Sequence, residues 1–305
     1  MSVRGYVTEY LRYCALRKEL SHNTLKAYRI DLKQFFDSVD CDTPEKLQIK
    51  HYIDELHEKY QQKTIKRKIA SIKAFYNYLE EEEIVQESPF RRIRVKFKEN
   101  IILPRIIPRE EIEKLLNCMY KYTTFCRKND YNSAIRNIAV IELLFVTVAR
   151  VYEDSNIKAD CIDLSSGQVR FMGKGSKERC VQIADSKILK LLRKYYDANL
   201  SEIEKSGYFF INRYGKRFSE ESIREMLSHY TSRAGITRKI TPHMFRHSFA
   251  TFLIEEGVDI SCVQHILGHS SIKTTQIYIH IATSKQAEIL QNLHPRKHMN
   301  VGYVA

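Results

Sequence analysis

Residues 241–251 read Thr-Pro-His-Met-Phe-Arg-His-Ser-Phe-Ala-Thr, and they predict a helix that begins with two polar side chains on one face. Pro242 suits the first helical position, because the backbone N–H there has no partner inside the helix. His243 and Arg246 are three residues apart, so they share a face. The N-terminus of a helix is electropositive, and we therefore expect this pair to form an anion site.

Downstream of this helix lies a segment with a second histidine and a tyrosine. Leu267-Gly268-His269-Ser270 is followed by Tyr278 in Thr-Thr-Gln-Ile-Tyr-Ile-His. A tyrosine hydroxyl is a possible nucleophile toward phosphorus, and its phenolate is a tolerable leaving group in the reverse step. An imidazole such as that of His269 is able to accept the phenol proton or to bind a phosphate oxygen.

Upstream of it, two further cations occupy distinctive places. Arg150 follows an apolar helical stretch, residues 133–149, and Lys174 lies in a Gly-Lys-Gly-Ser turn between two alternating strands, 168–172 and 179–183. Arginine meets phosphate oxygens with a planar fork of N–H groups. A lysine on a turn is suited to protonate a leaving oxygen.

Each of these residues also has an ordinary structural explanation when it is taken singly. An arginine is usually surface charge, a hairpin lysine is common, a histidine often caps a turn, and Tyr278 is one of nineteen tyrosines. We interpret His247 and His265 as structural. The hypothesis depends on the order of the set along the chain, because metal-free cleavage of a phosphodiester requires fixed cations, proton carriers and a hydroxyl nucleophile.

The first third of the chain predicts a separate helical domain. Residues 1–96 show helical apolar spacing, and the helix near residues 62–83 begins with basic residues and ends with Glu80 to Glu83. That order opposes the helix dipole, and a basic helix start suits phosphate, although a solvated charged face is the competing explanation. A basic, proline-containing segment follows it. The residues expected to contact DNA are Lys63, Lys66, Arg67, Lys68, Arg91, Arg92 and Arg94.

The division of the chain follows from its length and from this segment. At 305 residues we expect two domains. We assign 1–96 to the helical domain, 97–108 to a basic linker, 109–290 to a catalytic domain and 291–305 to a C-terminal tail. The expected fold class is mainly α with one small antiparallel β-sheet.

Composition narrows the partners and the compartment. The formal net charge is +13 and the sequence pI is about 9.3, which indicates a polyanionic partner. The chain has seven cysteines and no Cys-x-x-Cys pair, which predicts neither a disulfide framework nor a zinc site and favours a reducing compartment, the cytoplasm. No signal peptide and no apolar run of about 20 residues is present, so we expect no membrane partner.

The ordered set resembles the catalytic residues of the tyrosine recombinases, the family that includes phage integrases and Xer-type recombinases. The sequence segments around these residues are also similar to that family: GKGSKER, TPHMFRHSFAT, and LGHSS running to TTQIYIH. Two N-terminal segments are similar to it as well, SHNTLKAYRIDLKQFF and TIKRKIASIKAFYNYL. The resemblance covers nearly the whole chain and implies an N-terminal core-binding, SAM-like domain before the catalytic domain. The matching catalytic residues are Arg150, Lys174, His243, Arg246, His269 and Tyr278.

The resemblance implies a mechanism and partners. Arg150 and Arg246 would hold the scissile phosphate, Lys174 would be the general acid, and His243 and His269 would assist. Tyr278 would form a 3′-phosphotyrosine. No metal or other cofactor is expected. The partner would be double-stranded DNA, bound by four protomers that pass through a Holliday junction, with the free protein monomeric. The tail would dock in a neighbouring protomer.

The sequence departs from the family pattern around Arg150. The family commonly reads T-G-x-R-x-S-E-L, whereas this chain has Val148 for the glycine, Tyr152 for the serine and Asp154 for the leucine, while Glu153 is kept. Valine adds bulk where glycine allows close approach. We expect these changes to tilt Arg150 and to weaken cleavage.

Several functions therefore stay open at this stage. The leading hypothesis is an active site-specific recombinase that serves a mobile element, with Xer-type dimer resolution as an alternative. A DNA-binding protein of the same fold with weakened catalysis is the second. A type IB topoisomerase shares the chemistry, and a metal-dependent nuclease fits least because no carboxylate–histidine cluster is evident.

Overall fold

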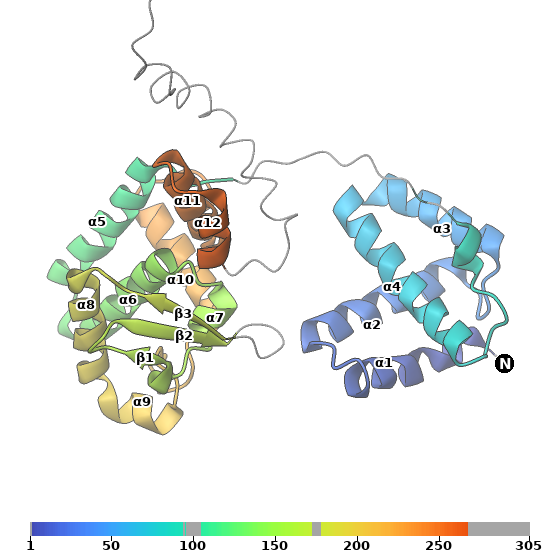
Figure 1. Cartoon of the computed structure of the whole chain (residues 1–305), viewed down its shortest axis with the longest axis horizontal. Helices are drawn as coiled ribbons and strands as arrows, with labels where there is room; N and C mark the ends of the chain where they lie inside the picture. Colours follow the sequence, from blue (N-terminus) through green and yellow to red (C-terminus); the bar gives the residue numbers. More distant parts are fainter. Residues whose placement is uncertain (1, 94, 96–104, 173–177, 268–305) are drawn as a thin grey trace, which may run out of the picture. The chain divides into compact units, whose positions relative to one another are not determined.

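The computed structural model describes residues 2–93, 95, 105–172 and 178–267, and the chain divides into two compact units. The units are Met1–Asn100 and Ile101–Ala305 (Figure 1). The described residues are mainly helical with one three-stranded antiparallel sheet, which confirms the predicted fold class. None of the helices in these ranges is long and apolar enough to cross a bilayer.

The first unit is built from four α-helices and two short 3-10 helices among its described residues. Ser21 caps the second α-helix, because its side chain accepts a hydrogen bond from the backbone of Thr24 at 3.3 Å. The elements are η1 (Val3–Tyr6), α1 (Val7–Leu16), α2 (His22–Val39), α3 (Lys46–Lys59), α4 (Gln62–Glu81) and η2 (Pro89–Arg92).

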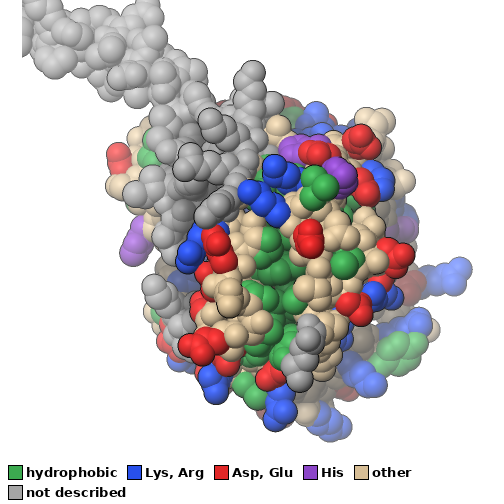
Figure 2. All heavy atoms as spheres, turned by 90° about the vertical axis from the view of Figure 1, so that its right-hand side faces the viewer, with side chains coloured by type: hydrophobic (Ala, Val, Ile, Leu, Met, Phe, Trp, Pro, Cys, Tyr) green, Lys and Arg blue, Asp and Glu red, His purple; other side chains and the backbone are tan. Residues whose placement is uncertain are grey.

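Aromatic side chains fill the core of the first unit. Phe35 of α2 meets Tyr52 of α3 edge-on with 5.1 Å between ring centroids, and Tyr10 of α1 meets Phe75 of α4 in the same way at 5.2 Å. Such pairs add about 0.5–1.5 kcal/mol beyond the burial of their area. On the face of this unit in Figure 2, charged side chains of both signs surround a strip of hydrophobic ones.

The second unit combines eight α-helices with the small sheet among its described residues. Pro108 precedes the first of these helices. The elements are α5 (Arg109–Phe125), η3 (Lys128–Asp130), α6 (Tyr131–Thr147), α7 (Val151–Ser155), η4 (Ala159–Cys161), β1 (Ile162–Asp163), β2 (Gln168–Met172), β3 (Glu178–Gln182), α8 (Ser186–Ala198), α9 (Leu200–Ser206), α10 (Glu220–Arg233), α11 (Pro242–Glu255) and α12 (Ile260–Leu267).

The sheet places alternate side chains toward the core. Its strand order is β1-β2-β3, with both pairs antiparallel, and Phe171 stands opposite Arg179 in the register. Val169 and Phe171 are buried while their neighbours on β2 are exposed. The two predicted strands are confirmed by β2 and β3, and the predicted turn at 173–176 lies outside the described residues.

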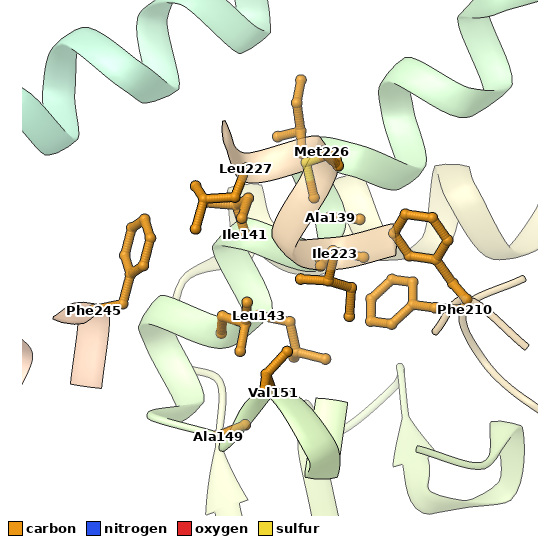
Figure 3. Packing of buried hydrophobic residues seen from close by; sticks show 14 of the residues in the cluster. Ala139, Ile141, Leu143, Ala149, Val151, Phe210, Ile223, Met226, Leu227 and Phe245 are labelled. Carbon is orange, nitrogen blue, oxygen red and sulfur yellow. The ribbon is translucent and has the colours of Figure 1, made fainter. Parts of the chain in front are cut away.

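Helix α6 runs through the middle of the second core. Leu143 on this helix belongs to one hydrophobic cluster with Ala149 and Val151 just beyond its end and with Ile223 on α10 (Figure 3). Ile107, which falls within the range predicted as linker, is also buried in this cluster, and its N–H donates to the Ser248 hydroxyl at 2.7 Å. The core of the second unit therefore begins inside that range.

Candidate active site

The described part of the chain contains three of the six predicted catalytic residues. Arg150 lies between α6 and α7, and His243 and Arg246 lie in the first two turns of α11. Lys174, His269 and Tyr278 lie outside the described residues. The described strands β2 and β3 flank Lys174 in the sequence, and α12 ends two residues before His269.

The backbone of Arg150 is anchored on both sides while its side chain reaches the surface. Ala149 and Val151 are 2% and 3% exposed, and both pack in the core cluster of Figure 3. The Arg150 side chain itself is 43% exposed. An arginine between two buried residues is held at a fixed point without being buried, which suits a group that must meet a ligand.

Glu153 fixes the conformation of Arg150 with two hydrogen bonds. The backbone N–H of Arg150 donates to Oε2 of Glu153 at 2.9 Å, and its guanidinium donates to Oε1 at 2.7 Å. The first of these bonds satisfies an N–H at the start of α7, as in a capping box. Tyr152, on the same short helix, is exposed and makes neither bond.

Val148 occupies the point at which the chain leaves α6. Its backbone is left-handed, with φ +55° and ψ +28°, which is a strained conformation for a β-branched residue. Its side chain is fully buried in a small cluster with Ala250 and Ile254 of α11 and with Val263 and Leu267 of α12. This packing holds a conformation that glycine would adopt without strain.

The start of α11 is as predicted, and it brings the His-x-x-Arg pair to this junction. Pro242 is the first helical residue, after Thr241. Arg246 is only 6% exposed, and its guanidinium donates to the carbonyl oxygens of Val148 and Leu267. It thereby joins the end of α6 to the end of α12.

His243 lies on the exposed side of the same helix turn. The pKa of its imidazole is lowered by partial desolvation, and then by the positive charges of Arg224, Arg246 and Arg150. A histidine with a lowered pKa is neutral at pH 7, so its imidazole is able to accept a proton. The charges of Arg246 and Arg150 both act on His243, and Arg246 contacts the carbonyl of Val148, two residues before Arg150, so the three side chains lie in one region of the second unit.

Arg179 on β3 is a further member of this site that is not among the residues predicted from the sequence. Its guanidinium donates to Oε2 of Glu153 at 2.7 Å, and its side chain is 16% exposed. A signal was available, because the period of two along a strand puts Arg179 on the same face as Val181 and Ile183, and a charged residue on a core face needs a partner.

The two carboxyl groups of α7 differ in state. Burial raises the pKa of Glu153, but the charge of Arg179 and the hydrogen bonds from Arg150 and Arg179 outweigh it and hold the pKa below its usual value. Burial, and then the charge of Glu153, raise the pKa of Asp154 well above the usual range, and its carboxyl oxygens have no hydrogen-bond partner among the described residues. Glu153 is therefore held as a carboxylate, whereas burial disfavours the charged form of Asp154.

In the first unit, the basic residues predicted to contact DNA differ in their exposure. Lys63 and Arg67 are exposed on α4, and Arg91 is exposed on η2, where it pairs with Glu80 at 3.0 Å. The prediction for Lys68 is wrong. Its ammonium is buried, lies 3.4 Å from the carboxylate of Asp31 and also donates to Gln34. The helical period places it on the inner face of α4, toward α2.

The remaining basic residues are described only in part. Lys66 is half-buried on α4. Arg92 belongs to η2, but its side chain, like the whole of Arg94, lies outside the described residues. Buried Asp31 also accepts hydrogen bonds from Arg67 and, at 2.8 Å, from the hydroxyl of Ser71. This network holds the second and third turns of α4 against α2.

Comparison with known proteins agrees with this arrangement. Residues 105–285 match the family described as "Phage integrase family", and residues 7–83 match "Phage integrase, N-terminal SAM-like domain". The chain therefore belongs to the phage integrase family of tyrosine recombinases, which are site-specific DNA recombinases. A protein named "Tyrosine recombinase" from Agathobacter rectalis is 44% identical over 300 residues, which are 97% of this chain and 98% of that protein.

Solved structures share the fold. XerH site-specific recombinase bound to a palindromic difH substrate, in a post-cleavage complex, is similar with a TM-score of 0.74 and 21% identity over 94% of this chain and 84% of that one. The lambda integrase tetramer bound to a Holliday junction is similar with a TM-score of 0.67 and 16% identity over 90% of this chain and 76% of that one. At these identities the likeness concerns the fold.

Proposed function

We propose that the chain cleaves and rejoins DNA through a 3′-phosphotyrosine on Tyr278. The observation that carries the proposal is that Arg246 of α11 donates to the carbonyl of Val148, two residues before Arg150, while His243 lies one turn before Arg246 on the same helix. Two fixed guanidinium groups and a neutral imidazole are what an anionic phosphate and a phenol proton require. Glu153 holds Arg150 in place despite the changes at Val148 and Tyr152, which favours an active enzyme over a weakened one.

The proposed roles follow the chemistry of each group. Arg150 and Arg246 bind the non-bridging oxygens of the scissile phosphate, and their charge stabilises the transition state. Lys174 protonates the leaving 5′-oxygen. His243 and His269 bind the phosphate and move the phenol proton. Each of these steps uses only groups of the chain itself.

The proposed nucleophile is tested by covalent capture. A nicked suicide duplex releases its short fragment on cleavage, so the protein–DNA adduct accumulates and is seen as a shifted band after denaturation. The site for this duplex is first recovered by covalent capture from a random-sequence duplex library. Wild-type protein is expected to form the adduct, and Tyr278→Phe is expected to abolish it.

Tyr152→Phe is the matched control, because Tyr152 is an exposed tyrosine two residues from Arg150. It should form the adduct at the wild-type rate. An adduct that persists in Tyr278→Phe and disappears in Tyr152→Phe would assign the nucleophile to Tyr152 instead.

We further propose that four protomers act together on two duplexes. The lambda integrase structure contains a tetramer on a Holliday junction, and the present chain shares its fold. The protein is expected to be monomeric when free. Mass photometry on a synthetic four-way junction carrying the recovered site tests this, with a tetrameric mass expected on the junction and a monomeric mass without DNA.

The DNA contacts of the first unit are proposed for Lys63, Lys66, Arg67, Arg91, Arg92 and Arg94. Exposed basic side chains on α4 and η2 suit the phosphate backbone, which fixes the register of a protein on its site.

We place the activity in the cytoplasm, because all seven cysteines are free thiols, as expected in a reducing compartment. We assign the biological role to a mobile element, with Xer-type dimer resolution as the alternative that sequencing of captured genomic sites distinguishes.

A further inference from the structure

Arg179 joins four elements of the second unit through one guanidinium group. Its Nη2 donates to Oε2 of Glu153 on α7 at 2.7 Å. Its Nη1 donates to the carbonyl oxygens of Thr147, the last residue of α6, and Ile266, near the end of α12, each at 3.3 Å. The guanidinium also stacks over the ring of Phe171 on β2, with 4.8 Å from Cζ to the ring centroid.

Arg179 and Arg246 bind adjacent carbonyl groups in the same two segments. Arg179 contacts residues 147 and 266, and Arg246 contacts residues 148 and 267. Both segments adjoin positions assigned to the reaction, because Arg150 follows the first and His269 follows the second. Two arginines therefore share the task of holding these segments together, although only Arg246 is proposed to touch the phosphate.

The charges at Glu153 give Arg179 a second role. Arg150, Arg179 and Glu153 together carry a net charge of +1, because one carboxylate is shared between two guanidinium groups. Without Arg179, Arg150 and Glu153 would form a neutral ion pair. The positive potential that Arg150 presents to an anionic phosphate would then be largely cancelled by the carboxylate 2.7 Å away.

We propose that Arg179 is a positioning residue for DNA strand cleavage, which balances the charge of Glu153 so that Arg150 keeps its positive charge for the phosphate. This inference rests on the function proposed above. Arg179 acts through Glu153, because its guanidinium donates to that carboxylate and to the carbonyl oxygens of Thr147 and Ile266.

The test measures single-turnover adduct formation on the suicide duplex, with affinity measured separately. Arg179→Met is expected to lower the rate at saturating DNA by about 100-fold, the scale of a small misplacement of a catalytic group. Its affinity for the duplex should stay within about threefold, because no phosphate contact is lost. Arg170→Met is the matched control, since Arg170 is an exposed arginine on the neighbouring strand β2, and it should keep the wild-type rate.

The charge mechanism makes a distinctive prediction for a double variant. Adding Glu153→Gln to Arg179→Met removes the carboxylate that Arg179 balances, so at least about tenfold of the lost rate should return. Arg179→Lys keeps the charge and should lie within about tenfold of wild type, and it provides the comparison if Arg179→Met fails to unfold cooperatively on heating.

The possible outcomes separate the two proposals. A wild-type chain that captures no duplex from the library would overturn the proposed function. An active wild type together with a fully active Arg179→Met, or a loss confined to affinity, or a double variant no faster than Arg179→Met, would overturn the role of Arg179 alone. A hundredfold slower single variant that the second substitution accelerates supports it.

Discussion

Arg246 donates a hydrogen bond to the carbonyl oxygen of Val148, the left-handed residue two positions before Arg150. The two arginines proposed to bind the phosphate are thus connected through three residues of backbone. Val148 has a strained φ of +55°, and its side chain packs against α11, the helix that carries Arg246. The conformation that aims the carbonyl at Arg246 is therefore held by packing rather than by local preference.

Val148→Gly is expected to destabilise the protein by only about 1 kcal/mol. Removal of a buried valine side chain costs roughly 2 kcal/mol and glycine adds about 0.7 kcal/mol of chain entropy, but the relief of a left-handed β-branched residue returns about 1–2 kcal/mol. The free energy of unfolding in urea measures the difference. Val140→Gly is the control, because Val140 is equally buried but lies within helix α6, and it should lose at least about 3 kcal/mol. Equal losses in the two variants would show that Val148 is not strained.

Asp154→Asn is expected to stabilise the protein at neutral and alkaline pH. The pKa of Asp154 is raised in the folded state above its usual value of 3.8. Between these two pKa values the carboxyl group ionises in the unfolded chain but not in the folded one, so the free energy of unfolding falls as the pH rises above 3.8. Asparagine does not ionise, so the variant should gain roughly 1–3 kcal/mol at pH 8 and little at pH 3.5. Urea unfolding across this range is the measurement.

Asp163→Asn is expected to change the free energy of unfolding in the opposite direction to Asp154→Asn. The pKa of Asp163 is lowered by hydrogen bonds from Ser165 and Ser166, so its contribution to stability is present above pH 3.8 and lost as the pH falls. This variant should be less stable than wild type at pH 7 and equal to it in acid. The same pH trend for both variants would contradict the raised pKa of buried Asp154.

His243 is expected to set the acid limit of the cleavage reaction. Its pKa is lowered below the usual 6.5, and the neutral imidazole is the form that accepts a proton, so the adduct rate should be flat above pH 6.5 and fall only below it. His243→Gln should lower the plateau by about 10²–10⁴-fold and remove the acid limb. An acid limb that stays unchanged in His243→Gln would assign it to another group.

Lys63 and Lys68, on the same helix, are expected to affect different properties. Lys63→Ala should reduce the slope of log affinity against log salt by about 1, as for the loss of one phosphate contact, and leave the stability unchanged. Lys68→Met removes one partner of buried Asp31, so it should cost about 2–4 kcal/mol and leave the salt slope unchanged. Filter binding at several salt concentrations and urea unfolding measure the two quantities, and a reduced salt slope in Lys68→Met would return Lys68 to the DNA interface.

Local signals in the sequence predicted several elements well. Ser21 before α2, Pro108 before α5 and Thr241-Pro242 before α11 each mark a helix start, because caps and first-turn prolines act within a few residues. The alternation of apolar and polar side chains over residues 168–172 predicted β2, because this pattern also depends only on near neighbours in the sequence. Arg150, His243 and Arg246 were predicted as a set from their order in the sequence and from the sequence segments around them.

The environments of single charged residues were harder to predict. Lys68 was placed among the DNA contacts because its neighbours are basic, yet its partner Asp31 lies 37 positions earlier on another helix. Arg179 was overlooked for a related reason. Its partners are 26, 32 and 87 positions away, and spacing along the chain carries no information about contacts of that range.

By itself the sequence determined the helical character of the chain, the start of the His-x-x-Arg helix, the small antiparallel sheet and the family to which they belong. These features depend on side-chain period and on capping, which act between near neighbours. Only the tertiary structure decided that Val148 is left-handed, that Asp154 is buried with a raised pKa, and that Arg179 shares Glu153 with Arg150. These properties arise from burial and from charges brought together across α6, α7, α11, α12 and the sheet, and the free energy of such contacts is set by the folded arrangement as a whole.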